Sequence, residues 1–481
     1  MGRIGKNYVY NLAYQIIVLL APIVTAPYLA RVVGAERLGI YSFVSSSGNI
    51  IITLSLLGIY SYGCRQTAYV RDQKQLLTQT FWEIMAARLL LTVLGTAIYA
   101  VFILLNRDTA RFLLLYYPYL LANFLDCSWV YVGLEDMLPA VIKNILVKLL
   151  TVAGIFLLVK GPGDLWIYIL LIAGATLLGN VLVYFQLPKY VGLSRPELHS
   201  FPVHIRGSLR LFFPQAAYMF YLQVDKVMLK WLTGATAQVS YYDQAEKIIM
   251  IPLTAVTVIS TVMMPRIANE FQKGNRDEIE RLLLRAGRFA LFLACPMMVG
   301  LFVVARQFVP WYLGPAFLPT ATAMMVLSPI VVLNSMTGIS GSQYFTATDQ
   351  ISVLFKAYGA AALINVVVNA LLIPRFGYLG AAIATVLSAA ISAVVQYRTL
   401  SRQIRLRPLG IDLLRKLSAS VEFGGILWAV SRTWPASIRT TAAQIGIGIL
   451  LWIVMMLLLR DPALRIAIRT LREIHIRRKR S

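Results

Sequence analysis

The sequence predicts an all-α membrane protein in which nearly the whole chain is built from transmembrane helices. Hydrophobic residues make up 58% of its 481 residues and charged residues only 14%, which is far from the balance of a soluble domain. Apolar runs recur along the entire chain, and a bilayer core about 30 Å thick needs about 20 mostly apolar residues per helix. The connections between these runs are short, so we expect no appended soluble domain.

About fourteen apolar runs are expected to form the transmembrane helices. They lie near residues 8–30, 39–62, 81–105, 112–133, 141–159, 165–187, 211–232, 238–264, 289–309, 319–344, 353–373, 378–397, 417–434 and 442–459. The first run follows a basic start, as a signal peptide does, but it is too long for one and another run follows at once. We therefore expect it to be retained as the first helix.

The distribution of basic residues predicts the orientation of these helices. The chain has 45 Lys and Arg residues against 21 Asp and Glu residues, a formal net charge of +24. In a soluble protein this excess would suggest nucleic acid, but here the basic residues gather in even-numbered connections, at residues 65–74, 189–210, 266–288 and 398–416. The positive-inside rule then places both termini in the cytoplasm, and the expected partners of this charge are membrane lipids rather than nucleic acid.

Two basic segments outside the apolar runs are expected to lie on the inner membrane surface. In the connection 266–288, Asn275 precedes Glu278 by three residues, a capping-box spacing that predicts a short amphipathic helix. The tail 460–481 alternates apolar and basic residues in the same manner. Both segments are predicted to anchor the chain to the membrane.

An internal repeat is predicted from residues that recur in the same order in both halves. Gly34 after the first run corresponds to Gly234 after the seventh, and YVGLEDMLPAVIK corresponds to YFTATDQISVLFK, which pairs Tyr131 with Tyr344. Such repeats are typical of transporters built from two similar bundles. The predicted organisation is therefore a six-helix lobe at 1–200, a second at 201–400, two further helices at 401–459, and the basic tail at 460–481.

No motif in the sequence predicts catalysis. The chain has only three histidines, His199, His204 and His475, all in predicted cytoplasmic segments, and it lacks nucleophile, zinc-binding and phosphate-loop motifs. We therefore expect no enzyme. The remaining candidates for chemistry are charged residues within the apolar runs, because charge in lipid is costly and usually faces a cavity.

Two charged clusters lie in the seventh and eighth runs. Asp225 and Lys226 belong to the seventh, and Asp243, Glu246 and Lys247 to the eighth. One interpretation is a polar cavity in which the lysines meet an anionic headgroup while the acids titrate or pair. The other is an ion pair that only fixes helix packing, for example Asp225 with Lys247.

Three arginines lie at or near the ends of the first three runs, namely Arg31, Arg65 and Arg88. They are candidates for the same cationic site, although long basic side chains near span ends also extend to the membrane surface without any ligand. Asp126 and Lys148 are expected partners between the fourth and fifth runs.

Three segments resemble a known family. RIGKNYVYNLAYQI, PYLARVVGAERLGIYSF and DKVMLKWLTGATAQVSYYDQAEKIIMIPL are similar to the polysaccharide-exporting branch of the superfamily that contains lipid-linked oligosaccharide flippases and multidrug and toxin extruders. The resemblance extends over essentially the whole chain, including the two lobes and the extra pair of helices. It implies a MATE-like fold.

The resemblance also implies a function. A related flippase carries an undecaprenyl-pyrophosphate-linked oligosaccharide from the cytoplasmic to the outer face of the bacterial plasma membrane by alternating access, for capsule, exopolysaccharide or O-antigen. Polysaccharide polymerase and export machinery are then the implied protein partners. No cofactor is expected, and coupling to a proton, to sodium through Asp225, Asp243 or Glu246, or to the membrane potential stays open.

The resemblance assigns roles to individual cations as well. Related lipid II flippases have functional arginines in the first, second and eighth helices, and these positions correspond to Arg31, Arg65 and Lys247. A lysine at the last position offers a point charge in place of bidentate phosphate recognition.

Two other functions are compatible with a chain of transmembrane helices. A multidrug or organic-cation antiporter of the same fold typically has an acidic residue in its first helix, and residues 8–30 contain none. A membrane polymerase or ligase acting on lipid-linked glycans would be expected to have a sizeable outer loop, whereas the odd-numbered connections here are short.

Overall fold

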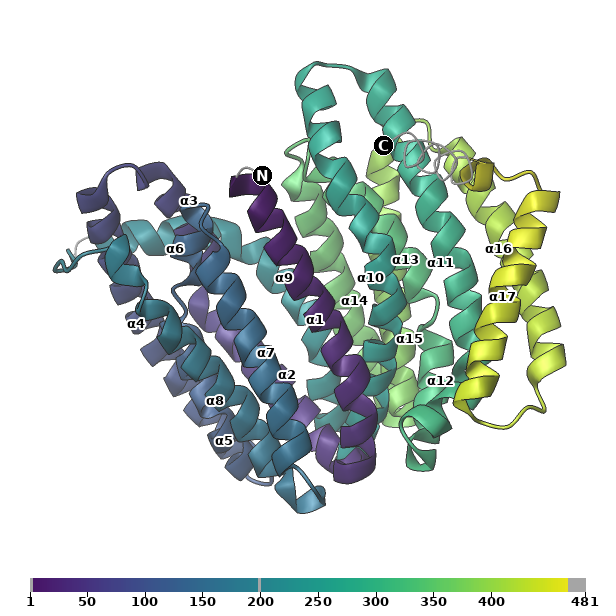
Figure 1. The fold of residues 1–481 in the computed structure, drawn as a ribbon, viewed down its shortest axis with the longest axis horizontal. Coiled ribbons are helices and arrows are strands. Elements are labelled where there is room, and N and C mark those ends of the chain that lie inside the picture. Colours follow the sequence, from purple (N-terminus) through teal and green to yellow (C-terminus); the bar gives the residue numbers. More distant parts are fainter. Residues whose placement is uncertain (1–2, 198–199, 466–481) are drawn as a thin grey trace, which may run out of the picture. The chain divides into compact units, whose positions relative to one another are not determined.

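In the computed structural model, which describes residues 3–197 and 200–465, the chain folds into α-helices joined by short connections (Figure 1). Each of the fourteen predicted apolar runs coincides with one helix or with an interrupted helix. Among the described residues, eight helices are long and apolar enough to cross a membrane, or nine if one bent pair counts as a single span. The prediction of an all-α, multi-pass membrane protein is confirmed, while the full count of fourteen spans stays a prediction.

The chain divides into two compact units, Met1–Ser240 and Tyr241–Ser481. The helices of the first unit are α1 (Arg3–Val33), α2 (Ala35–Leu56), α3 (Ile59–Val70), α4 (Lys74–Leu105), α5 (Ala110–Leu125), α6 (Ser128–Gly133), α7 (Leu138–Leu158), α8 (Leu165–Tyr184) and α9 (Phe201–Thr233), with the short 3₁₀ turns η1 (Pro162–Asp164) and η2 (Leu187–Lys189).

The second unit begins within α10 (Thr236–Gln272). It continues with α11 (Arg276–Tyr312), η4 (Pro315–Phe317), α12 (Leu318–Leu327), α13 (Ile330–Gly338), the π-helix η5 (Ile339–Phe345), α14 (Ile351–Phe376), α15 (Tyr378–Leu400), α16 (Arg407–Ser431) and α17 (Ile438–Leu458).

The predicted lobes and the two units describe different properties of the chain. The sequence assigned residues 201–233 to the second lobe, but α9 packs on α2, α3 and α4 and so belongs to the first unit. The units report packing, whereas the lobes concern a repeat, and the lobe boundaries at 200, 400 and 459 stay a prediction.

One turn has the same backbone geometry in both units. Glu135 and Asp349 have positive φ angles of 57° and 56°, and each is followed by a residue whose N–H donates across the turn, Asp136 to the Tyr131 carbonyl at 2.9 Å and Gln350 to the Phe345 carbonyl at 2.8 Å. Non-glycine residues seldom adopt this left-handed conformation. The match supports the repeat but pairs Tyr131 with Phe345, one residue beyond the predicted Tyr344.

Several predicted spans are interrupted, and proline does not mark every break. Helix α1 continues through Pro22 and Pro27, while the second span breaks at Leu57 and Gly58, with φ angles of 44° and 71°. A Cβ atom on Gly58 would lie about 3.1 Å from the Phe212 backbone, so this position requires glycine both for its φ angle and for the close approach of α9.

Pro329 does mark a bend. It lies between α12 and α13, where the helix pair turns by 47°. A proline has no backbone N–H to donate within the helix, and its ring clashes with the carbonyl group four residues earlier, so the helix axis bends at this point.

The predicted short surface helix is continuous with the ninth span. Asn275 does cap it, because its Oδ1 accepts from the backbone N–H of Glu278 at 3.4 Å. However, α11 then runs without a break to Tyr312. The prediction of a separate helix was wrong. Most of the predicted basic tail, residues 466–481, lies outside the described residues.

Ion pairs tie the two additional helices to the second unit. Arg288 Nε of α11 lies 2.7 Å from Asp412 Oδ2 of α16, and Lys416 Nζ lies 2.9 Å from Asp461 Oδ2, three residues beyond the end of α17. Lys416 and Asp461 are both fully buried. These contacts fix α16 and α17 to α11 as a packed group.

The predicted orientation can be tested with single cysteines. Gly163→Cys lies in an odd-numbered connection and Asp72→Cys in an even-numbered one, and both positions are exposed. Cys127 and Cys295 are buried, so Cys64→Ser is the only background change required. We expect an impermeant maleimide to label Gly163→Cys on intact cells and Asp72→Cys only after permeabilisation. The reverse pattern would place the termini outside.

Candidate functional site

Asp243 and Lys247 form an ion pair on α10 that leaves the lysine accessible. They lie four residues apart, on one face of the helix, with Lys247 Nζ 2.5 Å from Asp243 Oδ2. The Asp243 side chain is only 3% exposed, whereas that of Lys247 is 45% exposed. The carboxylate therefore holds the ammonium group from the buried side, and a second anion can reach it from the open side. The expected alternative pair, Asp225 with Lys247, is not the one found for Lys247.

Aromatic packing fixes the part of α10 that carries this pair. The Tyr242 hydroxyl lies 2.9 Å from Thr385 Oγ1 of α15. The Tyr241 ring meets the rings of Phe317 and Tyr378 edge-on, at centroid distances of 6.1 and 5.8 Å. Edge-to-face pairs of this kind stabilise a defined geometry. Lys247 is thus presented from a positioned helix.

The charged residues predicted on α9 are buried. Asp225 is completely inaccessible and Lys226 is 7% exposed. The structure therefore places Lys226 in the packed interior of the protein rather than at an open surface. At the end of α9, Lys230 Nζ lies 2.5 Å from Asp108 Oδ2 and 5.3 Å from the centre of the Phe43 ring. A substrate role for Lys226 and a coupling role for Asp225 stay predictions.

Arg31 and Arg65 are accessible. Arg31 lies in the last turn of α1 and is exposed. Arg65 lies on α3, after the break at Gly58, and its guanidinium group sits 5.9 Å from the centre of the Tyr62 ring. Both side chains can meet an anion without prior rearrangement of the core.

Arg88 occupies a different environment. It belongs to α4, and its side chain contacts the break between α5 and α6 in the fourth span. It is 2% exposed. Its Nη1 donates to the Asp126 carbonyl at 2.6 Å and its Nη2 donates to the Asn123 carbonyl. These carbonyls lie at the end of α5, where carbonyl groups lack their usual helical partners, although the Asn123 carbonyl also accepts from the backbone N–H of Asp126 at 3.3 Å. Arg88 therefore satisfies a helix terminus, and its predicted contact with substrate is left untested.

The break contains a buried polar network that the sequence located only in part. Lys143 Nζ of α7 lies 3.0 Å from Asp126 Oδ1, and it donates to Ser128 Oγ at 2.7 Å and to Asn180 Oδ1 at 2.9 Å. We call Arg88, Asn123, Asp126, Ser128, Lys143 and Asn180 the broken-helix cluster. Buried charges of this kind need both a partner and hydrogen bonds.

The predicted partner of Asp126, Lys148, was wrong, because Lys143 occupies that position. The signal that could have located the break is the spacing from Asp126 to Ser128. Asp126 Oδ1 accepts from the backbone N–H of Ser128 at 3.1 Å, the contact by which an aspartate stabilises a turn two residues ahead. Lys143, rather than Lys148, is then in reach of the restarted helix.

A second buried network was missed entirely. The Tyr62 hydroxyl lies 3.0 Å from His204 Nδ1, and His204 Nε2 lies 3.0 Å from Glu83 Oε2. All three side chains are buried, and they join α3, α9 and α4. In neutral His204, Nε2–H donates to the carboxylate and Nδ1 accepts from the tyrosine. The sequence signal was Glu83, an acid at the edge of an apolar run.

Comparison with known proteins identifies the family. A family model described as "Polysaccharide biosynthesis protein" matches residues 4–271, more than half of the chain. The chain belongs to this polysaccharide biosynthesis family. The predicted resemblance is therefore confirmed.

Transporters and flippases of other organisms are similar to this chain in sequence. The "Putative O-antigen transporter" of Escherichia coli strain K12 is 22% identical over 390 residues, which is 79% of this chain and 92% of that protein. The "Probable flippase AglR" of Haloferax volcanii is 28% identical over 192 residues, 40% of each chain. These names describe transporters and flippases, in agreement with the prediction that this polysaccharide biosynthesis family member is not an enzyme.

Solved structures establish the fold. The lipid II flippase MurJ in an inward closed conformation superimposes with a TM-score of 0.70 at 16% identity, covering 95% of this chain and 99% of that one. An inward-facing MATE multidrug transporter gives a TM-score of 0.64 at 16% identity, covering 82% and 95%. The predicted MATE-like fold is confirmed.

Proposed function

We propose that this protein is a flippase that moves an undecaprenyl-pyrophosphate-linked oligosaccharide from the cytoplasmic to the outer face of the bacterial plasma membrane. Family membership and the names of its relatives support a lipid-linked glycan as the class of substrate. The proposal includes fourteen spans with both termini in the cytoplasm, and alternating access as the mechanism.

The observation that carries the proposal is the geometry of Lys247. An ammonium group that is 45% exposed and held by a buried carboxylate can bind a diphosphate on its open side. Asp243 keeps its partner in this arrangement, so no buried charge is left unpaired. Lysine acts here as a point charge. A diphosphate carries more charge than one carboxylate and is therefore expected to attract the ammonium group strongly.

Arg31 and Arg65 are proposed as further phosphate-binding residues, since both are exposed and guanidinium groups bind phosphate through two parallel hydrogen bonds. Lys226 is proposed to contribute from α9, and Arg88 from the broken-helix cluster if that cluster opens during transport. Asp225, Asp243 and Glu246 are the proposed coupling residues.

The direction of transport agrees with electrostatics. Moving negative charge outward is favoured by an inside-negative membrane potential, by about 2.3 kcal/mol per charge for each 100 mV. The potential alone could therefore drive an anionic headgroup outward, with or without a coupled proton or sodium ion.

Deleting the gene tests this proposal. We expect the lipid-linked repeat unit to accumulate where only cytoplasmic reagents reach it, and surface polysaccharide to disappear until the intact chain is supplied again. A parallel drug-susceptibility assay separates the antiporter alternative, for which the deletion would sensitise cells and leave the glycan unchanged. A repeat unit still accessible from outside, in a strain without a redundant flippase, would refute the proposal.

A further inference from the structure

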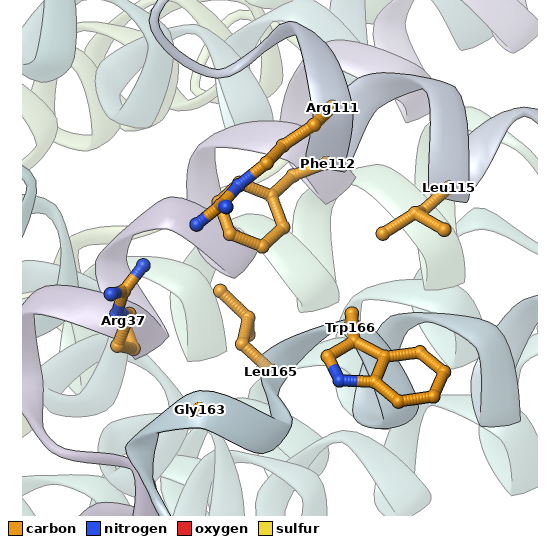
Figure 2. Close-up of a pocket in the computed structure, with 7 residues that line it drawn as sticks. All are labelled: Arg37, Arg111, Phe112, Leu115, Gly163, Leu165 and Trp166. Carbon is orange, nitrogen blue, oxygen red and sulfur yellow. The ribbon is translucent and has the colours of Figure 1, made fainter.

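A pocket in the first unit combines two arginines with an apolar wall. Its volume is about 340 Å³. The residues that line it are Arg37, Arg111, Phe112, Leu115, Gly163, Leu165 and Trp166 (Figure 2). None of these residues was a candidate in the sequence, and none belongs to the site proposed above.

The pocket lies where three helices begin. Arg37 is in the first turn of α2, Arg111 in the first turn of α5, and Trp166 in the first turn of α8. Helices α2, α5 and α8 pack on one another. The unpaired backbone N–H groups of a helix start carry partial positive charge and favour anions. Three such starts and two guanidinium groups therefore create a positive potential in one place.

The two arginines are not neutralised by nearby acids. Among the described residues, neither guanidinium group has an ion pair. Asp164 Oδ2 accepts from the backbone N–H groups of Lys160 and Gly161 at 2.8 and 2.9 Å, and Asp108 is paired with Lys230. Glu36 remains as an exposed neighbour in the chain, although adjacent residues on a helix do not face each other.

The cationic and apolar parts of the pocket lie on opposite sides. Figure 2 shows the guanidinium groups of Arg37 and Arg111 on one side and the side chains of Leu115 and Trp166 on the other. The Arg111 guanidinium carbon lies 4.4 Å from the centre of the Phe112 ring, which restricts the arginine to this position. Phe112 and Leu165 are 5% and 1% exposed and form the floor.

We infer that this pocket binds the phosphate of a lipid, with the phosphate between Arg37 and Arg111 and the first carbons of the chain against Leu115 and Trp166. Guanidinium groups match phosphate geometry, and tryptophan is typical of the level at which lipid headgroups lie. Pockets for whole small molecules range from about 300 to 1,000 Å³, so this one suits a headgroup rather than an oligosaccharide.

The side of the membrane on which Arg37 and Arg111 lie supports this inference. In the predicted orientation, α2, α5 and α8 begin on the outer side, where the positive-inside rule requires no basic residues. A lipid phosphate supplies a reason for two arginines there. The inference does not depend on transport, since it concerns binding at the outer end of the first unit.

Native mass spectrometry of the purified full-length chain tests the inference. The probes are undecaprenyl diphosphate, phosphatidylglycerol, phosphatidylcholine and inorganic pyrophosphate. We expect the double variant Arg37→Gln, Arg111→Gln to bind the phosphate-headed anionic lipids at least about tenfold more weakly, because two charge-assisted hydrogen-bonding groups are lost. Arg107→Gln, four residues before Arg111 but outside the pocket, is the matched control and should bind as the original chain does.

Further arms separate the sources and the sites. Trp166→Ala should weaken lipid binding and leave pyrophosphate binding unchanged. The same comparison in a Lys247→Ala background removes the proposed transport site, so a tenfold loss there supports the pocket whether or not the protein is a flippase. Unchanged lipid binding in the double variant, an equal loss in Arg107→Gln, or pyrophosphate binding as tight as lipid binding would overturn the inference.

Discussion

Replacing Lys143 with methionine should destabilise the first unit by about 3 kcal/mol. Removing one partner of a buried ion pair costs about 3–5 kcal/mol, because the other charge is left buried. The lower end applies because the Asp126 side chain is 20% exposed and keeps its contact with Ser128. Denaturant titration in detergent micelles, followed by circular dichroism, measures the change in the free energy of unfolding.

Two further variants make this prediction specific. Lys160→Met removes an exposed lysine from the connection after α7 and should change the free energy by less than about 0.5 kcal/mol. The double variant Asp126→Asn, Lys143→Met removes both charges and should recover part of the loss. A Lys143→Met chain as stable as the original would show that the broken-helix cluster does not support the fold.

Replacing Lys247 with alanine should abolish export while the protein remains in the membrane at its normal level. A hydrogen bond to a charged group contributes about 1.5–3 kcal/mol, so the loss should be at least roughly tenfold. Lys273→Ala is the matched control, because Lys273 is also an exposed lysine paired with a carboxylate, 2.7 Å from Glu270. Surface polysaccharide per cell, with membrane abundance measured in parallel, is the readout.

The partner of Lys247 allows its two possible roles to be separated. Lys247→Ala also leaves the buried Asp243 carboxylate without this ammonium group. In the double variant Asp243→Asn, Lys247→Gln, neither charge remains. If export returns, the lysine serves only to neutralise Asp243 and the proposed substrate contact is wrong. If export stays absent in a normally inserted chain while the single variant Asp243→Asn still exports, the ammonium group itself is required.

The candidate site was predictable where its chemistry is local. Asp243 and Lys247 are four residues apart on one helix, so their contact follows from helix geometry alone. Arg88 and Lys226 were selected by the same criterion of charge within an apolar run, yet both are buried. Charge in a span indicates a polar environment, but it does not distinguish a substrate surface from a packed helix break.

The residues that were missed depend on contacts between distant segments. His204 lies in a basic connection and gains its role only because α9 packs against α3 and α4, which brings Tyr62 and Glu83 to its two nitrogens. The lipid-phosphate pocket likewise needs Arg37 and Arg111 from separate helices. The spacing of residues along the sequence does not predict contacts between such distant segments.

The amino-acid sequence alone is sufficient to identify a multi-pass helical membrane protein of the polysaccharide biosynthesis family. Apolar length and basic-residue placement are properties that each segment carries alone, because the bilayer acts on every helix separately. The tertiary structure decided where the spans break, as at Gly58 and Asp126, and which charges pair. Those outcomes depend on neighbouring helices, since a buried polar group is stable only where another segment supplies its partner.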